Sequence, residues 1–200
     1  MPDATTLASA PAPRTTPGVA RHLPGEEGIW VFILGDMTVF AALFAVYLDA
    51  RQHDDKGFAR DAAHLSTSVG ALNTLLLLCS SLLVVVALDG IRRGDARSAR
   101  WVAGAMACGA GFVAVKAVEW GGHLSNGENP GADMFWRYYF ILTGLHLFHL
   151  LVGLGALGYL HRTARTTGNV RINLAEGCAC YWHMVDLLWV VLFGLFYVAR

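Results

Sequence analysis

The fold is decided by two stretches of sequence, YFILTGLHLFH at residues 139–149 and YWHMVDLLW at residues 181–189. Each belongs to an apolar segment long enough to cross a bilayer, yet together they contain three histidines and an aspartate. An ionisable group in hydrocarbon is costly unless it is paired or faces protein or water. Asp36, Lys116 and Glu119 lie in other apolar segments. We therefore predict a membrane-spanning bundle whose polar side chains face inward.

The composition also favours a membrane protein. Of the 200 residues, 55% are hydrophobic and 15% are charged, and the net charge is zero, so nothing indicates nucleic acid as a partner. Crossing ~30 Å of hydrocarbon takes about 20 apolar residues. Five segments meet this requirement, at residues 29–48, 69–88, 101–120, 135–160 and 178–199. The predicted fold class is all-α, a polytopic five-transmembrane-helix bundle within residues 26–200.

The amino-terminal residues 1–25 are rich in Pro, Ala and Thr and contain no apolar core of the signal-peptide type. We predict that they form a disordered tail. Arginine is concentrated in this tail and in the second and fourth connecting segments, which lie on one side of the membrane. The positive-inside rule then places the amino terminus in the cytoplasm and the carboxyl terminus outside.

Four polar residues fall in the same half of the membrane when depth is counted at about 1.5 Å per residue. They are Asp36, His149, His183 and Asp186. Three interpretations stay open. The groups could hydrogen-bond to each other and hold three helices in register. Alternatively, Asp36 is an exchangeable proton site with histidine as its relay, or His146 or His149 binds haem or a metal together with His183.

Two further charged residues lie one turn apart on the segment 101–120. Lys116 and Glu119 are predicted to form an intrahelical pair near the outer end, where long side chains can reach the interface. Earlier on the same segment, Ala103, Ala107 and Gly111 repeat every four residues. Such a small-residue face lets another helix approach closely, so we predict that this helix lies in the interior of the bundle.

Four stretches carry a resemblance to a known family. They are GIWVFILGDMTVFAALFAVYL at 28–48, FVAVKAVEW at 112–120, YFILTGLHLFHLLVG at 139–153 and YWHMVDLLWVVLFGLFYV at 181–198. In order and spacing they resemble the helices of subunit III of the haem-copper respiratory oxidases. The patterns T-G-x-H-x-x-H-x-x-x-G and Y-W-H-x-V-D-x-x-W are specific in combination.

The resemblance implies an accessory subunit that is not catalytic alone and has no cofactor or metal of its own. Haem and copper are expected only in its partner, catalytic subunit I. Family members hold phospholipid in a cleft and support proton uptake during turnover. Asp36 matches a membrane-buried carboxylate, usually Glu, and Lys116 and Glu119 match a Q-x-x-E-like turn. The polar residues of the two signature helices are matched by His146, His149, His183 and Asp186.

The chain also departs from the family pattern. Longer members have seven helices, so the two-helix arm that forms one wall of the lipid cleft is missing here or is supplied by another subunit. The leader LPGEEGIWVFILGDM at 23–37 is more similar to the branch associated with nitric oxide reductase, and in part to the quinol oxidase branch. The partner therefore stays open between an oxygen reductase and a nitric oxide reductase.

Two alternatives come from other functional classes. A membrane cytochrome would use His146 or His149 with His183 to bind haem. A proton-coupled transporter would use Asp36 and Asp186 along a water-filled path. The resemblance argues against both and implies a multi-pass protein of the bacterial plasma membrane.

Overall fold

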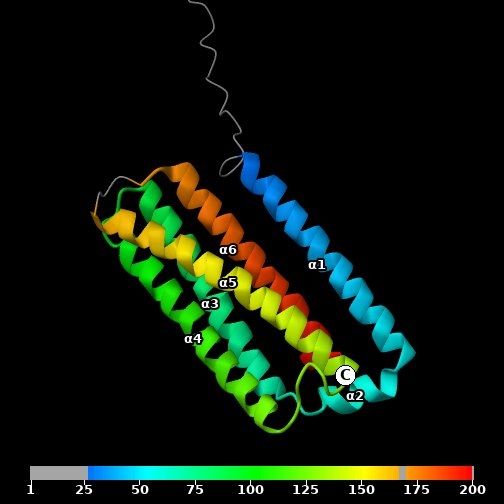
Figure 1. Ribbon diagram of the computed structural model, residues 1–200. Coiled ribbons are helices and arrows are strands. Elements are labelled where there is room, and N and C mark those ends of the chain that lie inside the picture. Colours follow the sequence, from blue (N-terminus) through cyan, green and yellow to red (C-terminus); the bar gives the residue numbers. More distant parts are fainter. Residues whose placement is uncertain (1–26, 167–169, 200) are drawn as a thin grey trace, which may run out of the picture.

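The computed structural model describes residues 27–166 and 170–199 as helices joined by short connections (Figure 1). The elements are α1 (Glu27–His53), α2 (Asp55–Ala62), α3 (Thr67–Arg92), α4 (Ser98–Ser125), α5 (Met134–Thr166), α6 (Ile172–Phe193) and the π-helical turn η1 (Gly194–Val198). Five of the described segments, α1, α3, α4, α5 and α6 with η1, are long and apolar enough to cross a membrane. The predicted fold class is confirmed, whereas the predicted tail at 1–25 lies outside the described residues.

The helices extend past the apolar segments from which they were predicted. Helix α6 begins at Ile172, whereas the predicted segment began at Cys178. Helix α4 ends at Ser125, whereas the predicted segment ended at Trp120. The added turns contain polar residues such as Glu176 and His123, which shorten the apolar run without interrupting the helix. Apolar run length therefore marks the membrane-embedded part of each helix and underestimates its full length.

The helices α3, α4, α5 and α6 form a four-helix bundle. Helix α3 packs against α4 and α6, and α5 packs against the same two helices on the other side. Helix α1 lies at one edge, where it contacts α5 and α6, and the short α2 returns the chain beneath it (Figure 1). The functional questions therefore centre on the bundle interior and on the seam between α1 and α5/α6.

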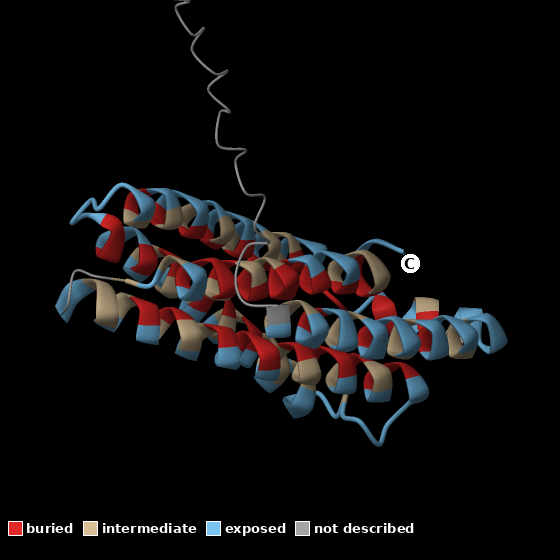
Figure 2. Ribbon diagram, turned by 90° about the horizontal axis from the view of Figure 1, so that it is seen from above, coloured by how far each residue is buried: buried red, intermediate tan, exposed pale blue. Residues whose placement is uncertain are grey.

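Burial follows the faces of the helices (Figure 2). The inward faces are buried, whereas large apolar side chains such as Leu75, Val118 and Phe148 are exposed on the outward faces. An outward face of this kind would be unfavourable in water and is the expected surface of a helix in lipid. Helix α1 exposes most of its apolar residues, so it is held to the bundle along a narrow stripe.

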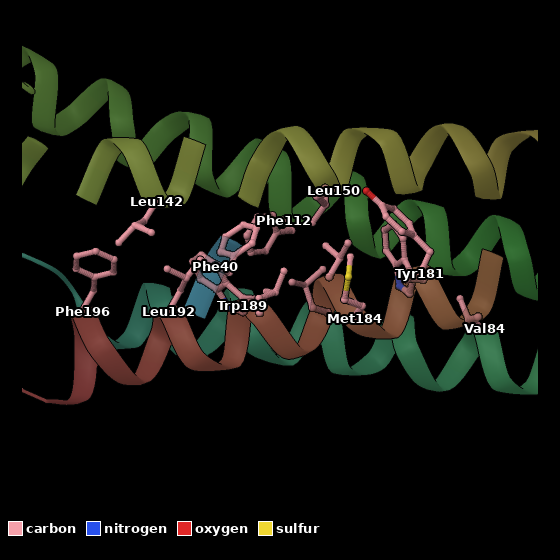
Figure 3. Close-up of a cluster of buried hydrophobic side chains, with 14 of the residues drawn as sticks. Phe40, Val84, Phe112, Leu142, Leu150, Tyr181, Met184, Trp189, Leu192 and Phe196 are labelled. Carbon is pink, nitrogen blue, oxygen red and sulfur yellow. The ribbon is translucent and has the colours of Figure 1, made fainter. Parts of the chain in front are cut away.

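Aromatic side chains fill the interior of the bundle (Figure 3). The rings of Phe112 and Trp189 meet edge to face with centroids 4.6 Å apart, a favoured geometry for aromatic pairs. Phe40 of α1 is fully buried and its ring contacts that of His149 of α5. Because indole and phenyl rings interdigitate across four helices, the helices cannot slide past each other without repacking this layer.

The prediction that the segment 101–120, now α4, lies in the interior of the bundle is wrong. Gly104 and Gly111 lie close to Leu83 and Leu76 of α3, but Ala103 and Ala107 are exposed. A residue repeated every four positions advances by about 40° around a helix with 3.6 residues per turn. The small residues therefore do not share one buried face, and α4 forms a wall of the bundle.

Glycines create the space for one large side chain of α6. A Cβ atom added at Gly109 would lie 2.9 Å from the Trp182 ring, and one added at Gly153 would lie 2.8 Å from it. The indole is held between α4 and α5 and is fully buried. Both distances are too short for a real contact, so neither position accepts a side chain unless the ring moves.

We predict that Gly153→Ala destabilises the protein by about 1–3 kcal/mol, because the rigid Trp182 ring has no room to move. Thermal unfolding in mild detergent measures the effect. Gly155→Ala is the matched control on the same helix, since nothing lies within 4 Å of an added Cβ there. Equal melting temperatures for the two variants would contradict this packing.

Candidate functional site

The first polar contact joins α1 to α5. Asp36 Oδ2 lies 3.0 Å from His149 Nε2, with side chains that are 16% and 9% exposed. The other ring nitrogen, His149 Nδ1, is 2.7 Å from the Leu145 carbonyl. A carbonyl only accepts, so Nδ1 carries a proton and donates it. A neutral imidazole then presents a lone pair at Nε2 to the carboxylate, and the contact is favourable only if Asp36 or His149 holds one more proton.

The surroundings of this pair fix its position. The ring of Phe40 contacts His149 edge on, with centroids 5.4 Å apart. Tyr181 of α6 donates a hydrogen bond to the His149 carbonyl at 3.1 Å. Asp36 Oδ2 has no hydrogen-bond partner among the described residues, so its approach to His149 Nε2 is an ionic contact without hydrogen-bond geometry. The pair therefore lies at the seam of three helices, with Asp36 on its partly exposed side.

The remaining residues of the predicted polar layer have different partners. His183 Nδ1 is hydrogen-bonded to Ser81 Oγ at 2.6 Å, which links α6 to α3. Asp186 is buried, and neither of its carboxylate oxygens has a hydrogen-bond partner within the described part of the chain. The interpretation of Asp36, His149, His183 and Asp186 as one mutually hydrogen-bonded network is therefore wrong. Equal depth does not place side chains at the same angle around the bundle.

His146 occupies an aromatic environment in the bundle core. It is fully buried, and its ring lies 5.6 Å from that of Phe112 and 5.3 Å from that of Trp189, between centroids. Neither ring nitrogen has a hydrogen-bond partner among the residues that the structure describes. Within the same residues, no three His, Cys, Asp or Glu side chains are placed to hold a metal ion.

A second polar cluster surrounds Lys116 and confirms its predicted pairing with Glu119. The ammonium Nζ donates to Glu119 Oε2 at 3.0 Å and to the hydroxyls of Tyr139 and Tyr197 at 2.9 Å each. Tyr197 donates in turn to Glu119 Oε1 at 2.5 Å. Lys116 is 1% exposed, so the expectation that its side chain reaches the membrane interface is wrong. All three ammonium hydrogens are used inside the protein.

Sequence reasoning missed the two tyrosines of this cluster. Tyr197 lies in the π-helical turn η1, whose wider winding changes the direction of its side chain relative to an α-helix. The Lys116 ammonium also lies 4.7 Å from the centroid of the Tyr139 ring and 5.1 Å from that of Trp189. Such cation–π contacts compensate in part for the lost hydration of the charge.

A third cluster lies in the connections at the end of the bundle near α2. Glu128 accepts hydrogen bonds from Nδ1 of His64 and from Nδ1 of His123. Burial favours the neutral acid, but the two histidine contacts outweigh it and hold the pKa of Glu128 below its usual value. The cluster ties the α2–α3 connection to the α4–α5 connection. Sequence analysis confined to the apolar segments could not find it.

Comparison with known proteins decides the family. The family model described as cytochrome c oxidase subunit III matches residues 16–199. The chain belongs to this family. As a subunit III, it is a non-redox accessory subunit of a haem-copper oxidase and a multi-pass protein of the bacterial plasma membrane. Membership also implies a subunit I partner.

Three relatives illustrate the range of the family. Cytochrome c oxidase subunit 3 of Thermostichus vulcanus is 30% identical over 178 residues, which are 86% of this chain and 85% of that protein. Quinol oxidase subunit 3 of Bacillus subtilis is 27% identical, over 83% of this subunit III and 82% of its own length. Heme-copper oxidase subunit I+III of Aeropyrum pernix is 27% identical over 91% of this chain and 24% of that longer protein.

We predict that Lys116→Met destabilises this subunit III by about 3–5 kcal/mol, because it leaves the buried Glu119 carboxylate without its counter-charge. The double variant Lys116→Met with Glu119→Gln removes both charges and should recover most of the loss. Melting temperatures in detergent compare the two. If the double variant unfolds as readily as the single one, charge compensation is not what the pair contributes.

Because the pKa of Glu128 is lowered, we predict that the folded protein becomes less stable as the pH falls into the acid range. A depressed carboxyl pKa stabilises the fold above the unfolded value, about 4.3, and the gain disappears as the pH falls through the lowered value. The melting temperature of the parent protein should therefore exceed that of Glu128→Gln at pH 6, and the difference should shrink toward pH 3. Asp133→Asn, at a more exposed carboxylate nearby, is the control. A difference independent of pH would contradict this prediction.

Proposed function

We propose that this subunit III stabilises the catalytic subunit I of an oxygen-reducing haem-copper oxidase and supports its proton uptake. The observation that carries the proposal is the 3.0 Å contact between Asp36 and His149, with the second histidine nitrogen already bonded to Leu145. Since the contact is favourable only while Asp36 or His149 holds that proton, the pair would take up one proton as the contact forms and release it as the contact opens. A group of this kind supplies protons without carrying out redox chemistry itself.

The position of the pair supports a role at the protein surface. His149 faces the bundle, whereas Asp36 lies on α1 and is partly exposed. A proton can therefore enter or leave on the Asp36 side while Phe40 and Tyr181 keep the imidazole in place. We propose that this side communicates with the proton uptake of the catalytic subunit.

The choice of partner rests on the relatives. Those reported above carry the names of cytochrome c, quinol and heme-copper oxidases, which favours an oxygen reductase as the partner. The nitric oxide reductase predicted from residues 23–37 gains no support from them. We also propose that the amino terminus lies in the cytoplasm, because the arginine-rich connections lie at the end where α1 begins.

A groove in the structure supports the phospholipid binding that the resemblance implies. An apolar groove of about 390 Å³ lies between α1 and the α5/α6 pair, and its lining includes Phe32, Val152, Ala156 and Gly177. The groove is open toward lipid and too apolar for a hydrated ligand. We propose that it accepts an acyl chain that fills the space where α1 departs from the bundle.

The test uses the intact oxidase complex containing Asp36→Ala or the isosteric Asp36→Asn. Both variants remove the ionisable carboxyl group of the pair, so we expect activity to be lost several-fold faster during turnover or subunit III to dissociate more readily. Turnover time courses measure this.

Asp49→Asn is the matched control, since this aspartate is on the same helix but exposed at its end. It should behave as the parent complex does. If both Asp36 variants keep the parental complex stability and turnover lifetime, the pair has no role in proton supply. If Asp36→Asn keeps the parental lifetime and only Asp36→Ala fails, the role is structural.

A further inference from the structure

Unpaired cations gather where α3 and α5 end and α4 begins. Arg97 directly precedes α4, Arg100 lies in its first turn and Arg165 lies in the last turn of α5. All three are exposed, and none forms an ion pair with another residue that the structure describes. The neighbouring Arg92 and Arg93 are neutralised by Glu176 and Asp89. We call Arg97, Arg100 and Arg165 the arginine rim.

Two adjoining hollows lie beside the arginine rim. One of about 600 Å³ is lined by Arg97, Arg100 and Arg165 together with Ala103 and His161, among others. The second hollow, of about 410 Å³, is also lined by Arg97 and Arg100. Its other lining residues are Leu83, Trp101 and Gly104. The three arginines therefore line a concave surface of the protein.

The walls change from basic to apolar along α4. Beyond Arg100 come the half-exposed Trp101, the small Ala103 and then Gly104, where an added Cβ would lie 3.3 Å from Leu83. Tryptophan at this level is typical of the membrane interface. The absence of larger side chains at the two small positions leaves a shallow channel that leads from the charged rim onto the lipid-facing surface of α4.

A hydrogen bond fixes one wall of the larger hollow. His161 Nδ1 donates to the Ala99 carbonyl at 2.8 Å, which ties the end of α5 to the start of α4. The bond orients the imidazole and leaves Nε2 as its remaining polar atom. Asp95, the nearby carboxylate, accepts from the Arg97 backbone amide at 2.9 Å and so is engaged in the turn.

We propose that the arginine rim binds an anionic phospholipid. The phosphate would lie among Arg97, Arg100 and Arg165, and one acyl chain would follow Leu83 and Gly104 along α4. Guanidinium groups pair with phosphate oxygens, and basic pockets at the ends of membrane helices suit anionic head groups. An inorganic anion or an acidic peptide would leave the apolar channel unused. The site is separate from the groove beside α1, since none of the residues that line that groove lines either hollow.

The first test is native mass spectrometry of the detergent-solubilised protein with phosphatidylglycerol or phosphatidylcholine added. We expect phosphatidylglycerol to be retained in preference. Arg97→Gln with Arg100→Gln should reduce its retention by about thirtyfold, since each cation near a membrane contributes about 1 kcal/mol. Arg162→Gln, an exposed arginine of α5 that does not line either hollow, should retain the lipid as the parent does.

A second pair of variants tests the channel without changing the charge. Ala103→Trp fills the hollow and should also lower phosphatidylglycerol retention, whereas Ala110→Trp, farther along the exposed face of α4, should not. Inorganic phosphate at millimolar concentration should not displace the lipid. These substitutions leave Asp36 and His149 intact, so their outcome is independent of the role proposed for that pair.

Three results would overturn the proposal. The first is equal retention of the two lipids by the parent protein. The second is unchanged retention in both the double arginine variant and Ala103→Trp. The third is release of the catalytic subunit by the arginine variants with lipid retention unaltered, which would assign the rim to an acidic segment of the partner.

Discussion

Hydrocarbon offers no hydrogen bonds, so a charged side chain inside the membrane is stabilised chiefly by partners within the protein. Lys116 meets the requirement most completely, with a carboxylate and two phenols around its ammonium group. The three groups that surround it come from α4, α5 and the π-helical turn η1. The same requirement therefore positions the carboxyl-terminal turn against the bundle and selects how three helices meet.

The two principal polar clusters satisfy this requirement in different ways. Around Lys116 every ammonium hydrogen and both Glu119 oxygens are engaged, so the cluster is closed and is suited to holding helices together. The Asp36–His149 pair is smaller and lies at the edge of the bundle. The proton exchange that we propose for this pair is therefore separate from the cluster that holds the helices together, and a change in one need not disturb the other.

Sequence predicted much of the fold and part of the site. The five membrane segments and the Lys116–Glu119 pair follow from apolar run length and from one-turn spacing, which are local properties. Depth counting placed Asp36 and His149 at similar heights but could not give the angle of each side chain around the bundle. For that reason it also grouped Asp186 with them, although Asp186 does not share their contact. The contribution of Tyr197 depends on a π-helical turn, which has no simple sequence signature.

That turn also makes the end of the chain sensitive to its length. A π-helix accommodates about one more residue per turn than an α-helix, and loss of one residue would rotate the next side chains by about 100° around the helix axis. In η1 (Gly194–Val198) the residue so rotated is Tyr197, which bonds both Lys116 and Glu119. The carboxyl-terminal segment therefore tolerates changes of side chain better than changes of register. A single deletion there would act at a distance, on the charge balance of α4.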